Sequence, residues 1–259
     1  MIEDIVSHIR KYWAEADRKN LTDKYEQMLK SSWERRSLSE ALRGDERLSF
    51  VFEIKRKSPS LGEMNTGINP TQWAKLYEKH HATAVSVLTE KKHFAGSLDD
   101  LVDVSEAIEL PVLRKDFIVD KLQLTETLAY RADAVLLIVR LLGEKTGEYV
   151  EACRALRIEP LVEIHNEEEL AMALDSDTEI IGINNRDLDT LEIDLDTTAR
   201  LLPKIPGGNL IVSESGISSA KEVDMMRVLG VDAVLIGSAL SRAESLETKL
   251  EELVECQRK

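Results

Sequence analysis

A strand–helix–strand pattern stands out at residues 159–185: Glu159-Pro-Leu-Val-Glu-Ile164, an amphipathic segment, and Ile180-Ile-Gly-Ile-Asn-Asn185. The two flanking runs are short and aliphatic, as strands are. Between them, Asn166 and Glu169 form a pair typical of a helix start, and apolar residues follow at helical spacing. The pattern predicts two parallel strands joined by a helix.

The same pattern extends in both directions along the chain. Six more aliphatic or β-branched runs bring the total to eight, with starts 21 to 35 residues apart, and each interval holds one amphipathic segment of helical length. The six are Ser49-Phe-Val-Phe-Glu-Ile-Lys55, Ala84-Val-Ser-Val-Leu-Thr89, Pro111-Val-Leu-Arg-Lys-Asp116, Ala132-Asp-Ala-Val-Leu-Leu-Ile-Val139, Asn209-Leu-Ile-Val-Ser-Glu-Ser215 and Ala233-Val-Leu-Ile-Gly-Ser238.

Eight such units predict an α/β fold in which the strands form a closed (β/α)8 TIM barrel, because closure leaves no exposed edge strand. The alternative is an open, doubly wound sheet. No glycine-rich dinucleotide loop or Walker loop follows any of the runs, which disfavours that alternative.

Residues 1–48 stand outside the repeating pattern. They contain two apolar stripes at helical spacing and no Pro/Gly/Ser-rich linker. We therefore expect a helical extension packed on the barrel, so that residues 1–259 form a single domain. The stripes are Ile2, Ile5, Val6, Ile9 and Trp13, and then Tyr25, Met28, Leu29 and Trp33.

Composition excludes several classes of protein. The chain has 259 residues, of which 43% are apolar and 32% charged, so it can bury a full core and is not disordered. Its 34 basic and 48 acidic residues give a net charge of −14, which disfavours nucleic acids and anionic membranes as partners. The longest apolar run, Ala134 to Val139, is too short for a membrane helix.

The cysteines and the N-terminus indicate a reducing compartment. Cys153 and Cys256 lie far apart and form no metal-binding pattern. The first residues are acidic and lack the apolar core of a secretory signal. We expect a soluble, cytoplasmic protein whose oligomeric state the sequence leaves open.

Five of the eight predicted strands end in polar residues. In a (β/α)8 barrel the active site lies at the carboxyl ends of the strands, where inward-pointing side chains converge. Any one of these residues could instead lie on an exposed rim, but a set of five is difficult to explain by chance. Side chains alternate along a strand, so Glu53 and Lys55 share a face, as do Asn184 and Arg186. Lys115 and Glu163 end two further runs.

These residue types fit acid–base chemistry on an anionic substrate. Burial and neighbouring charges in a semi-enclosed mouth shift the pKa values of lysines and carboxylates towards neutrality. Arg186 can bind a carboxylate through two parallel hydrogen bonds. Backbone N–H groups at Glu214-Ser-Gly-Ile217 and Ile236-Gly-Ser238 lie after the last two strands, where such barrels bind phosphate.

Two other features have more than one interpretation. The loop Arg56-Lys-Ser-Pro-Ser-Leu-Gly62 is basic and could close over an anionic substrate, or it could be a solvated surface loop. The five histidines show no metal-ligand spacing, so no metal site is expected. His165 follows Glu163 closely, and a structural role is favoured over one at the mouth.

The chain resembles the indole-3-glycerol-phosphate synthase family from residue 49 to about residue 240. The motifs that carry the resemblance occur in order and together are highly specific. They are Glu-Ile-Lys-Arg-Lys-Ser-Pro-Ser (53–60), Leu-Thr-Glu (88–90), Leu-Arg-Lys-Asp-Phe-Ile (113–118), Pro-Leu-Val-Glu-Ile (160–164), Gly-Ile-Asn-Asn-Arg-Asp-Leu (182–188), Glu-Ser-Gly-Ile (214–217) and Ile-Gly-Ser (236–238).

The resemblance implies a carbon–carbon lyase (a carboxy-lyase) of tryptophan biosynthesis. Its substrate would be 1-(2-carboxyphenylamino)-1-deoxyribulose 5-phosphate, and its products indole-3-glycerol phosphate, carbon dioxide and water. Ring closure, decarboxylation and loss of water would need no metal or redox cofactor, so none is expected.

The resemblance also implies a role for each matching residue. Lys115 would be the general acid of ring closure, Glu163 would assist dehydration, and Lys55 would be a second acid. Glu53 would position the lysines or accept a proton. Asn184 and Arg186 would face the anthranilate end. The ring pocket would comprise Phe94, Phe117, Leu136 and Leu188. The phosphate contacts would be Ser58, Ser215, Gly216, Gly237 and Ser238, and Glu214 would be a further substrate-binding residue.

Three alternatives stay open. Phosphoribosylanthranilate isomerase is another phosphate-binding barrel, but it would require a Cys where this chain has Glu53-Ile-Lys55. A Schiff-base aldolase could use Lys115 as a nucleophile. A phosphate-binding protein without activity could share the fold, although a binder has little use for paired acids and bases.

Overall fold

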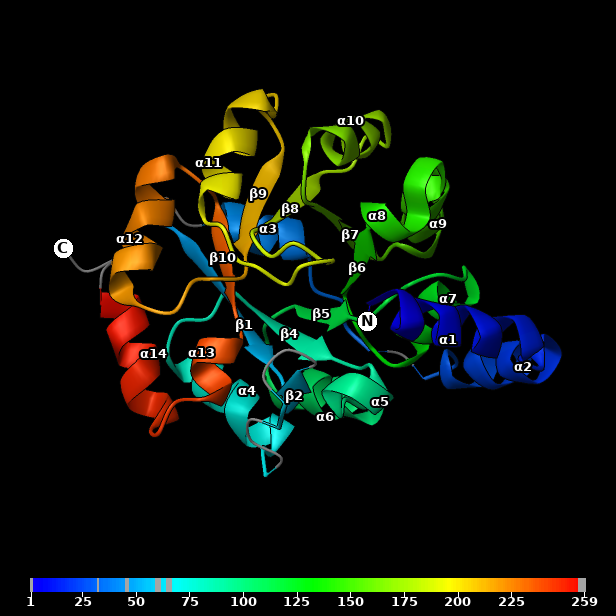
Figure 1. Cartoon of the computed structure of the whole chain (residues 1–259). Helices are drawn as coiled ribbons and strands as arrows, with labels where there is room; N and C mark the ends of the chain where they lie inside the picture. The colour runs from blue at the N-terminus through cyan, green and yellow to red at the C-terminus, as the bar shows by residue number, and fades with distance from the viewer. Residues whose placement is uncertain (1, 32, 45–46, 59–61, 64–66, 256–259) are drawn as a thin grey trace.

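Eight parallel strands close into a barrel in the described part of the chain, which comprises residues 2–31, 33–44, 47–58, 62–63 and 67–255 of this computed structural model (Figure 1). Strand β1 pairs with both β4 and β10, which completes the circle. The barrel strands are β1 (Ser49–Ile54), β4 (Ala84–Leu88), β5 (Val112–Lys115), β6 (Ala134–Ile138), β7 (Glu159–Ile164), β8 (Ile180–Asn184), β9 (Leu210–Glu214) and β10 (Ala233–Ile236). A two-stranded ribbon, β2 (Lys57–Ser58) and β3 (Gly62–Glu63), follows β1.

Helices surround the barrel and alternate with its strands. Their start signals act as the sequence suggests: the Asn166 side chain accepts a hydrogen bond from the Glu169 amide at 2.9 Å. The helices of the barrel are α4 (Pro70–Lys79), α5 (Lys91–Phe94), α6 (Asp99–Ala107), α7 (Leu122–Ala129), α8 (Val139–Leu142), α9 (Thr146–Leu156), α10 (Glu167–Asp175), α11 (Asp196–Leu201), α12 (Ala220–Leu229), α13 (Ser238–Ser241) and α14 (Leu246–Glu255), with short 3₁₀ turns η1 (Gly143–Lys145) and η2 (Leu202–Lys204). The N-terminal helices are α1 (Ile2–Glu15), α2 (Arg18–Met28) and α3 (Leu38–Arg43).

Side-chain alternation along the strands divides the apolar core into two parts. In β1, Phe50 and Phe52 belong to the layer between the barrel and its helices. Val51 belongs to the cluster inside the barrel, together with Leu113 of β5 and Leu161 of β7. The next inward position on each of these three strands is a charged residue at the carboxyl end. The alternation therefore directs those side chains to a common place.

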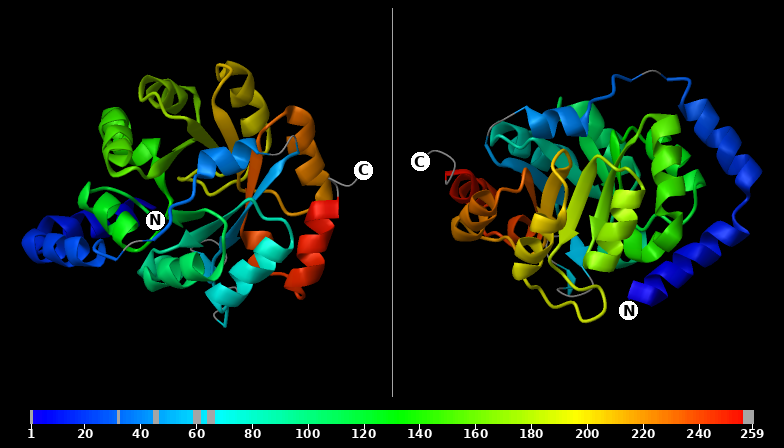
Figure 2. Two further views of the ribbon diagram at one scale, coloured as in Figure 1. Left: turned by 180° about the vertical axis from the view of Figure 1, so that it is seen from behind. Right: turned by 90° about the horizontal axis from the view of Figure 1, so that it is seen from above.

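Helix α3 covers the opposite, amino-terminal end of the barrel. The backbone amide of Ser39 donates to Glu159 Oε2, at the start of β7, at 2.7 Å. Leu38 and Leu42 are buried and join the cluster inside the barrel. In the left view of Figure 2, α3 lies across this end of the barrel. The amino-terminal end is therefore closed.

Helices α1 and α2 run from that closed end along the side of the barrel (Figure 2). Tyr25 of α2 donates to Glu126 Oε1 of α7 at 2.5 Å. Arg10 of α1 donates to the carbonyl of Leu141, in the segment after β6, at 3.0 Å. Ile5 of α1 is buried. The extension thus contacts both ends of the barrel.

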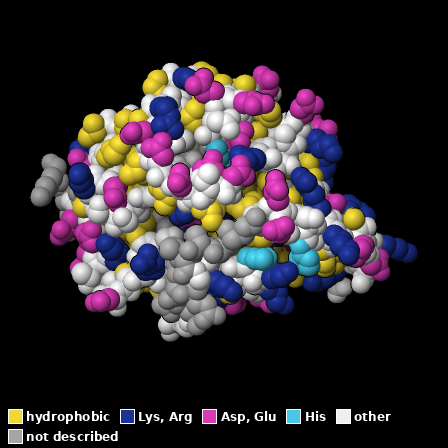
Figure 3. Space-filling model, in the orientation of Figure 1, with side chains coloured by type: hydrophobic (Ala, Val, Ile, Leu, Met, Phe, Trp, Pro, Cys, Tyr) yellow, Lys and Arg dark blue, Asp and Glu magenta, His cyan; other side chains and the backbone are white. Residues whose placement is uncertain are grey.

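The expected (β/α)8 barrel with N-terminal helices is confirmed. Cys153 is buried in α9, and burial raises the pKa of its thiol to about 12. Cys256 lies outside the described residues. No described helix combines the length and the apolar character needed to cross a membrane. The face drawn in Figure 3 carries interspersed acidic and basic side chains.

Candidate active site

A cavity of about 680 Å³ opens at the carboxyl ends of the strands. This volume lies within the range of roughly 300–1,000 Å³ that is usual for small-molecule sites. Of the site residues expected from the sequence, Glu214 does not line this cavity. The others do: Glu53, Lys55, Ser58, Phe94, Lys115, Phe117, Leu136, Glu163, Asn184, Arg186, Leu188, Ser215, Gly216, Gly237 and Ser238.

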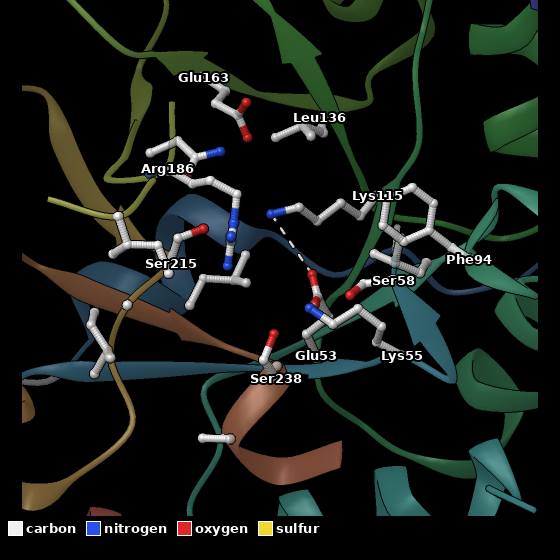
Figure 4. A pocket seen from close by; sticks show the side chains of 18 of the residues that line it. Glu53, Lys55, Ser58, Phe94, Lys115, Leu136, Glu163, Arg186, Ser215 and Ser238 are labelled. Atoms are coloured by element: carbon white, nitrogen blue, oxygen red, sulfur yellow. Dashed lines mark hydrogen bonds and ion pairs between the residues drawn. The ribbon is translucent and has the colours of Figure 1, made fainter. Parts of the chain in front are cut away.

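The centre of the cavity holds a cluster of charges (Figure 4). Lys115 Nζ lies 2.5 Å from Glu214 Oε2 and 3.7 Å from Glu53 Oε2. Glu53 Oε1 lies 2.7 Å from Lys55 Nζ. Glu53 is 3% exposed, so its charge is stabilised by the two ammonium groups rather than by water. Burial raises the pKa of Glu53, but Lys55 and Lys115 outweigh burial and the net shift is downward.

The pKa of Lys115 shifts in the direction opposite to the expected one, away from neutrality. Burial lowers the pKa of this lysine, but the carboxylates of Glu214 and Glu53 outweigh burial and raise the pKa well above its usual value. The apolar neighbour Phe117 therefore does not set the protonation of the lysine. Lys115 is therefore an ammonium group at neutral pH.

Glu214 lies behind Lys115 rather than on the cavity wall. It is fully buried, and its Oε1 has no hydrogen-bond partner among the described residues. Burial raises the pKa of Glu214 to about 7, with Lys115 opposing the shift and Glu163 adding to it. Its position makes it a partner of the lysine rather than a direct contact of a ligand.

Two glycines make room for the buried carboxylates. A Cβ atom on Gly182 of β8 would lie 2.4 Å from Glu214 Oε1. A Cβ atom on Gly237, just after β10, would lie 2.1 Å from Glu53 Oε1. Because real Cβ atoms essentially never approach so closely, any other residue at either position would displace the carboxylate.

Glu163 occupies another side of the cavity, near Arg186 and Leu136 (Figure 4). Burial raises its pKa, but His165 and Lys115 outweigh burial and hold the pKa of Glu163 below its ordinary value. Asn184 lowers this pKa further, and its Oδ1 accepts from the Arg186 amide at 3.0 Å. Glu163 is therefore a carboxylate.

The backbone after β9 turns sharply at the expected phosphate-binding end. Ser215 has φ = 66° and Gly216 has φ = 84°, both in the left-handed region. A non-glycine residue in that region is uncommon and is found more often at functional sites. Ser238 is the first residue of α13, which follows the neighbouring strand β10, and it faces the same cavity (Figure 4).

Apolar side chains line the side of the cavity next to Lys115. Phe94 and Phe117 lie with ring centroids 6.1 Å apart. Phe117, Leu136 and Leu188 are buried. A flat aromatic group has apolar surroundings here, a few ångströms from the charged cluster.

Several lining residues were not anticipated from the sequence. Glu90 accepts from the backbone amide of Phe94 at 3.0 Å and so holds α5; it lies in the Leu-Thr-Glu motif, which pointed to it without giving it a role. No motif marks Ile2 of α1, Arg242 directly after α13 or Lys249 of α14, which only the fold brings to the mouth.

The basic loop after β1 is described only in part. Lys57 and Ser58 form β2, and Ser58 is buried. The Arg56 guanidinium is paired with Asp100 of α6. Residues 59–61 lie outside the described residues, so closure of the loop over a substrate stays a prediction.

Two solved structures share the fold at low sequence identity. Thiamine phosphate pyrophosphorylase from Pyrococcus furiosus has a TM-score of 0.62 at 16% identity, covering 86% of this chain and 98% of that one. The 3-hexulose-6-phosphate synthase from Salmonella typhimurium has a TM-score of 0.65 at 12% identity, covering 82% and 99%. At these identities the likeness concerns the fold alone.

Sequence comparisons are far more specific. The indole-3-glycerol phosphate synthase of Aquifex aeolicus is 47% identical over 208 residues, which are 79% of this chain and 80% of the relative. The enzyme of that name from Geobacillus sp. is 44% identical over 223 residues, or 85% and 86%. The sequence model described as "Indole-3-glycerol phosphate synthase" matches residues 2–253, the barrel and its N-terminal helices together. The chain belongs to the indole-3-glycerol phosphate synthase family.

Proposed function

We propose that the cavity closes the indole ring of 1-(2-carboxyphenylamino)-1-deoxyribulose 5-phosphate. The ring carbon that bears the carboxylate attacks the ribulose carbonyl carbon, and the carbonyl oxygen takes a proton. Loss of carbon dioxide and then of water restores aromaticity and gives indole-3-glycerol phosphate.

Lys115 is the general acid of ring closure. The attack leaves negative charge on the carbonyl oxygen, and a fixed ammonium group both stabilises that charge and donates the proton. The charged state of Lys115, maintained by Glu214 and Glu53, supports this role. A Schiff-base mechanism would need the neutral amine, which the same carboxylates disfavour.

Glu163 accepts a proton during dehydration. Its lowered pKa supports the assignment, because a base must be ionised before it acts. Lys55 is the second acid and donates to the departing hydroxyl. Glu53 positions both lysines through its two ion pairs.

The two ends of the substrate bind at different sides of the cavity. The aromatic ring lies among Phe94, Phe117, Leu136 and Leu188, with Asn184 and Arg186 near the carboxylate. Backbone N–H groups after β9 and β10 bind the phosphate at Ser215, Gly216, Gly237 and Ser238, and Ser58 contributes from β2.

One observation carries the proposal: a lysine ammonium stands between an apolar pocket and the turns after β9 and β10. Such a place suits a substrate with an aromatic ring at one end, a phosphate at the other and a reacting carbonyl between them. The net charge of −14 agrees with a small-molecule substrate rather than a nucleic acid. We place the enzyme in the cytoplasm.

The test is turnover of the carboxyphenylamino substrate, followed by the fluorescence of the indole product. Lys115→Met keeps the stem and removes the acid, so kcat should fall by roughly 10²- to 10⁴-fold while the substrate still binds. Lys57→Met, in the ribbon after β1, is the matched control and should cost far less. Near-normal turnover by Lys115→Met would refute the acid assignment and make Lys55 the first candidate.

A further inference from the structure

His165 is a buried titratable residue to which the proposed mechanism gives no role. It lies directly after β7, in the turn that leads into α10, and its side chain is 6% exposed. Its ring lies between two carboxylates, those of Glu163 and Glu169. A histidine placed between two buried acids interacts strongly with both.

Glu169 fixes the orientation of the ring. One of its carboxylate oxygens, Oε2, lies 2.9 Å from His165 Nδ1 and accepts from the His165 backbone amide at 2.8 Å. The other oxygen accepts from Asn166 Nδ2 at 3.0 Å. An ionised carboxylate can only accept hydrogen bonds, so Nδ1 carries a proton.

The second ring nitrogen faces the catalytic side. His165 Nε2 lies 3.3 Å from Glu163 Oε1, an ion-pair contact without hydrogen-bond geometry, and the Glu163 side chain is 2% exposed. Burial lowers the pKa of His165, but Glu163 and Glu169 outweigh burial and raise it to about 10. With Nδ1 protonated and a carboxylate in front of Nε2, the ring is an imidazolium at neutral pH.

The other groups that face Glu163 do not duplicate this contact. Lys115 faces it from β5, but the ammonium group is paired with Glu214 and lies near Glu53. Glu53 and Glu214 are both acids, so neither supplies a positive charge that would keep Glu163 ionised. Asn184 is neutral. Among the described groups, His165 is the cation that contacts the Glu163 carboxylate from outside the cavity wall.

We propose that His165 is a positioning residue for the reaction: its imidazolium lies against one carboxylate oxygen of Glu163 and keeps this group ionised, leaving the other oxygen for the substrate. This inference rests on the proposed role of Glu163 as a proton acceptor. Glu169 holds the imidazolium in place, and Asn166 in turn holds Glu169. These contacts connect the start of α10 to the cavity through His165 and Glu163. A merely structural histidine would stabilise this turn without affecting the protonation of Glu163.

The first test compares the pH dependence of kcat in the native protein and in His165→Asn. Loss of a cation a few ångströms from a carboxylate raises the pKa of that carboxylate by about 1–3 units. The acidic limb of the kcat profile should therefore move to higher pH by about that amount, with KM for the substrate near its native value. His8→Asn, at an exposed position on α1, is the matched control and should leave the profile unchanged.

An acidic limb that stays in place in a folded, active His165→Asn protein would overturn the proposal. Glu169→Gln is a second variant, which removes the negative charge that faces His165 Nδ1 and keeps the shape of the side chain. It should move the acidic limb in the same direction as His165→Asn, by less.

The second test measures the protonation of the His165 ring directly in the native protein and does not depend on enzyme activity. With ¹⁵N-labelled histidine, one of the five imidazoles should keep both ring nitrogens protonated at a pH where exposed histidines are neutral. If all five lose a proton near the ordinary histidine pKa, the proposal fails. A protein that shows the imidazolium signal but does not turn over the substrate would instead contradict the proposed function alone.

Discussion

Glu159 and Glu163 stand at opposite ends of β7, and their surroundings differ. Glu159 accepts three hydrogen bonds from neutral donors at the start of α3: Ser37 Oγ, in the residue that caps the helix, at 2.7 Å, the Ser39 amide at 2.7 Å and Ser39 Oγ at 3.2 Å. Glu163 faces a cavity, and the groups that determine its pKa include His165 and Lys115. The first carboxylate closes the barrel, whereas the second remains open to a ligand.

The contrast teaches that the partners of a charged residue reveal its role better than its type or its strand. Neutral donors around Glu159 occupy its acceptor positions and leave little for a ligand. Ionised partners of Glu163, His165 and Lys115, maintain its charge without covering it. The same distinction separates the two ends of the barrel, since α3 seals one end and the other carries the cavity.

The largest expected effect concerns the closed end and the question of domains. We propose that the extension and the barrel form one domain, so deleting residues 1–44 should remove most of the stability. Buried side chains such as Ile5, Trp13 and Leu38 each contribute roughly 1.5–3 kcal/mol, against a total of about 5–15 kcal/mol for a typical protein. Urea unfolding followed by circular dichroism measures the loss.

A shorter deletion of residues 1–16 sharpens the comparison, because it removes α1 and leaves α3 over the closed end. It should cost less stability than the longer deletion. An unchanged urea midpoint after the longer deletion would show that the extension is dispensable for the fold.

The next effect concerns the open end. In Gly237→Ala the new methyl group must displace the Glu53 carboxylate, which releases Lys55 and alters the setting of Lys115. A misplacement of about 1 Å at a reacting group can cost about 100-fold in rate, so kcat/KM should fall by that order. Gly207→Ala is the control, since no atom lies within 4 Å of its Cβ position. Equal activity of the two variants would contradict the close-approach argument.

The barrel itself was predictable from the sequence because two regular signals agreed. Aliphatic runs recurred at intervals that suit strand–helix units, and alternation within each run placed Glu53, Lys115 and Glu163 on the inward face. The family resemblance added the identity of the chemistry. These signals are local in the sequence, so they can be recognised without knowledge of the fold.

What could not be predicted depends on contacts between distant segments. The sequence placed Glu214 at the substrate, but the fold buries it behind Lys115, and that pairing raises the pKa of the lysine instead of lowering it. Ile2 and Lys249 reach the cavity from opposite ends of the chain. Amphipathic spacing predicts that a helix packs on the barrel, but it does not say which end of that helix reaches the mouth.

A smaller effect concerns the pH dependence of stability. Burial raises the pKa of Glu214 from about 4.5 to about 7, so the folded state favours the protonated form. The contribution of Glu214 to stability is therefore full below about pH 4.5 and is lost as the pH rises through 7. The difference in Tm between the native protein and Glu214→Gln should shift against the native protein by several degrees from pH 5 to about pH 8. Glu192→Gln, at an exposed carboxylate, should show no such shift.

The smallest effect returns to Glu159, where the comparison began. Glu159→Gln keeps one acceptor oxygen and replaces the other with an amide that cannot accept from Ser39, so it loses a hydrogen bond to a charged group. Such a bond contributes about 1.5–3 kcal/mol, and the urea midpoint should fall accordingly while kcat and KM stay at their native values. Glu179→Gln at the same end breaks only an exposed ion pair with Arg43 and should cost at most about 1 kcal/mol. If Glu159→Gln instead lowered kcat at unchanged stability, the two ends of β7 would be coupled through the strand. The separation of a closing end from a reacting end would then be wrong.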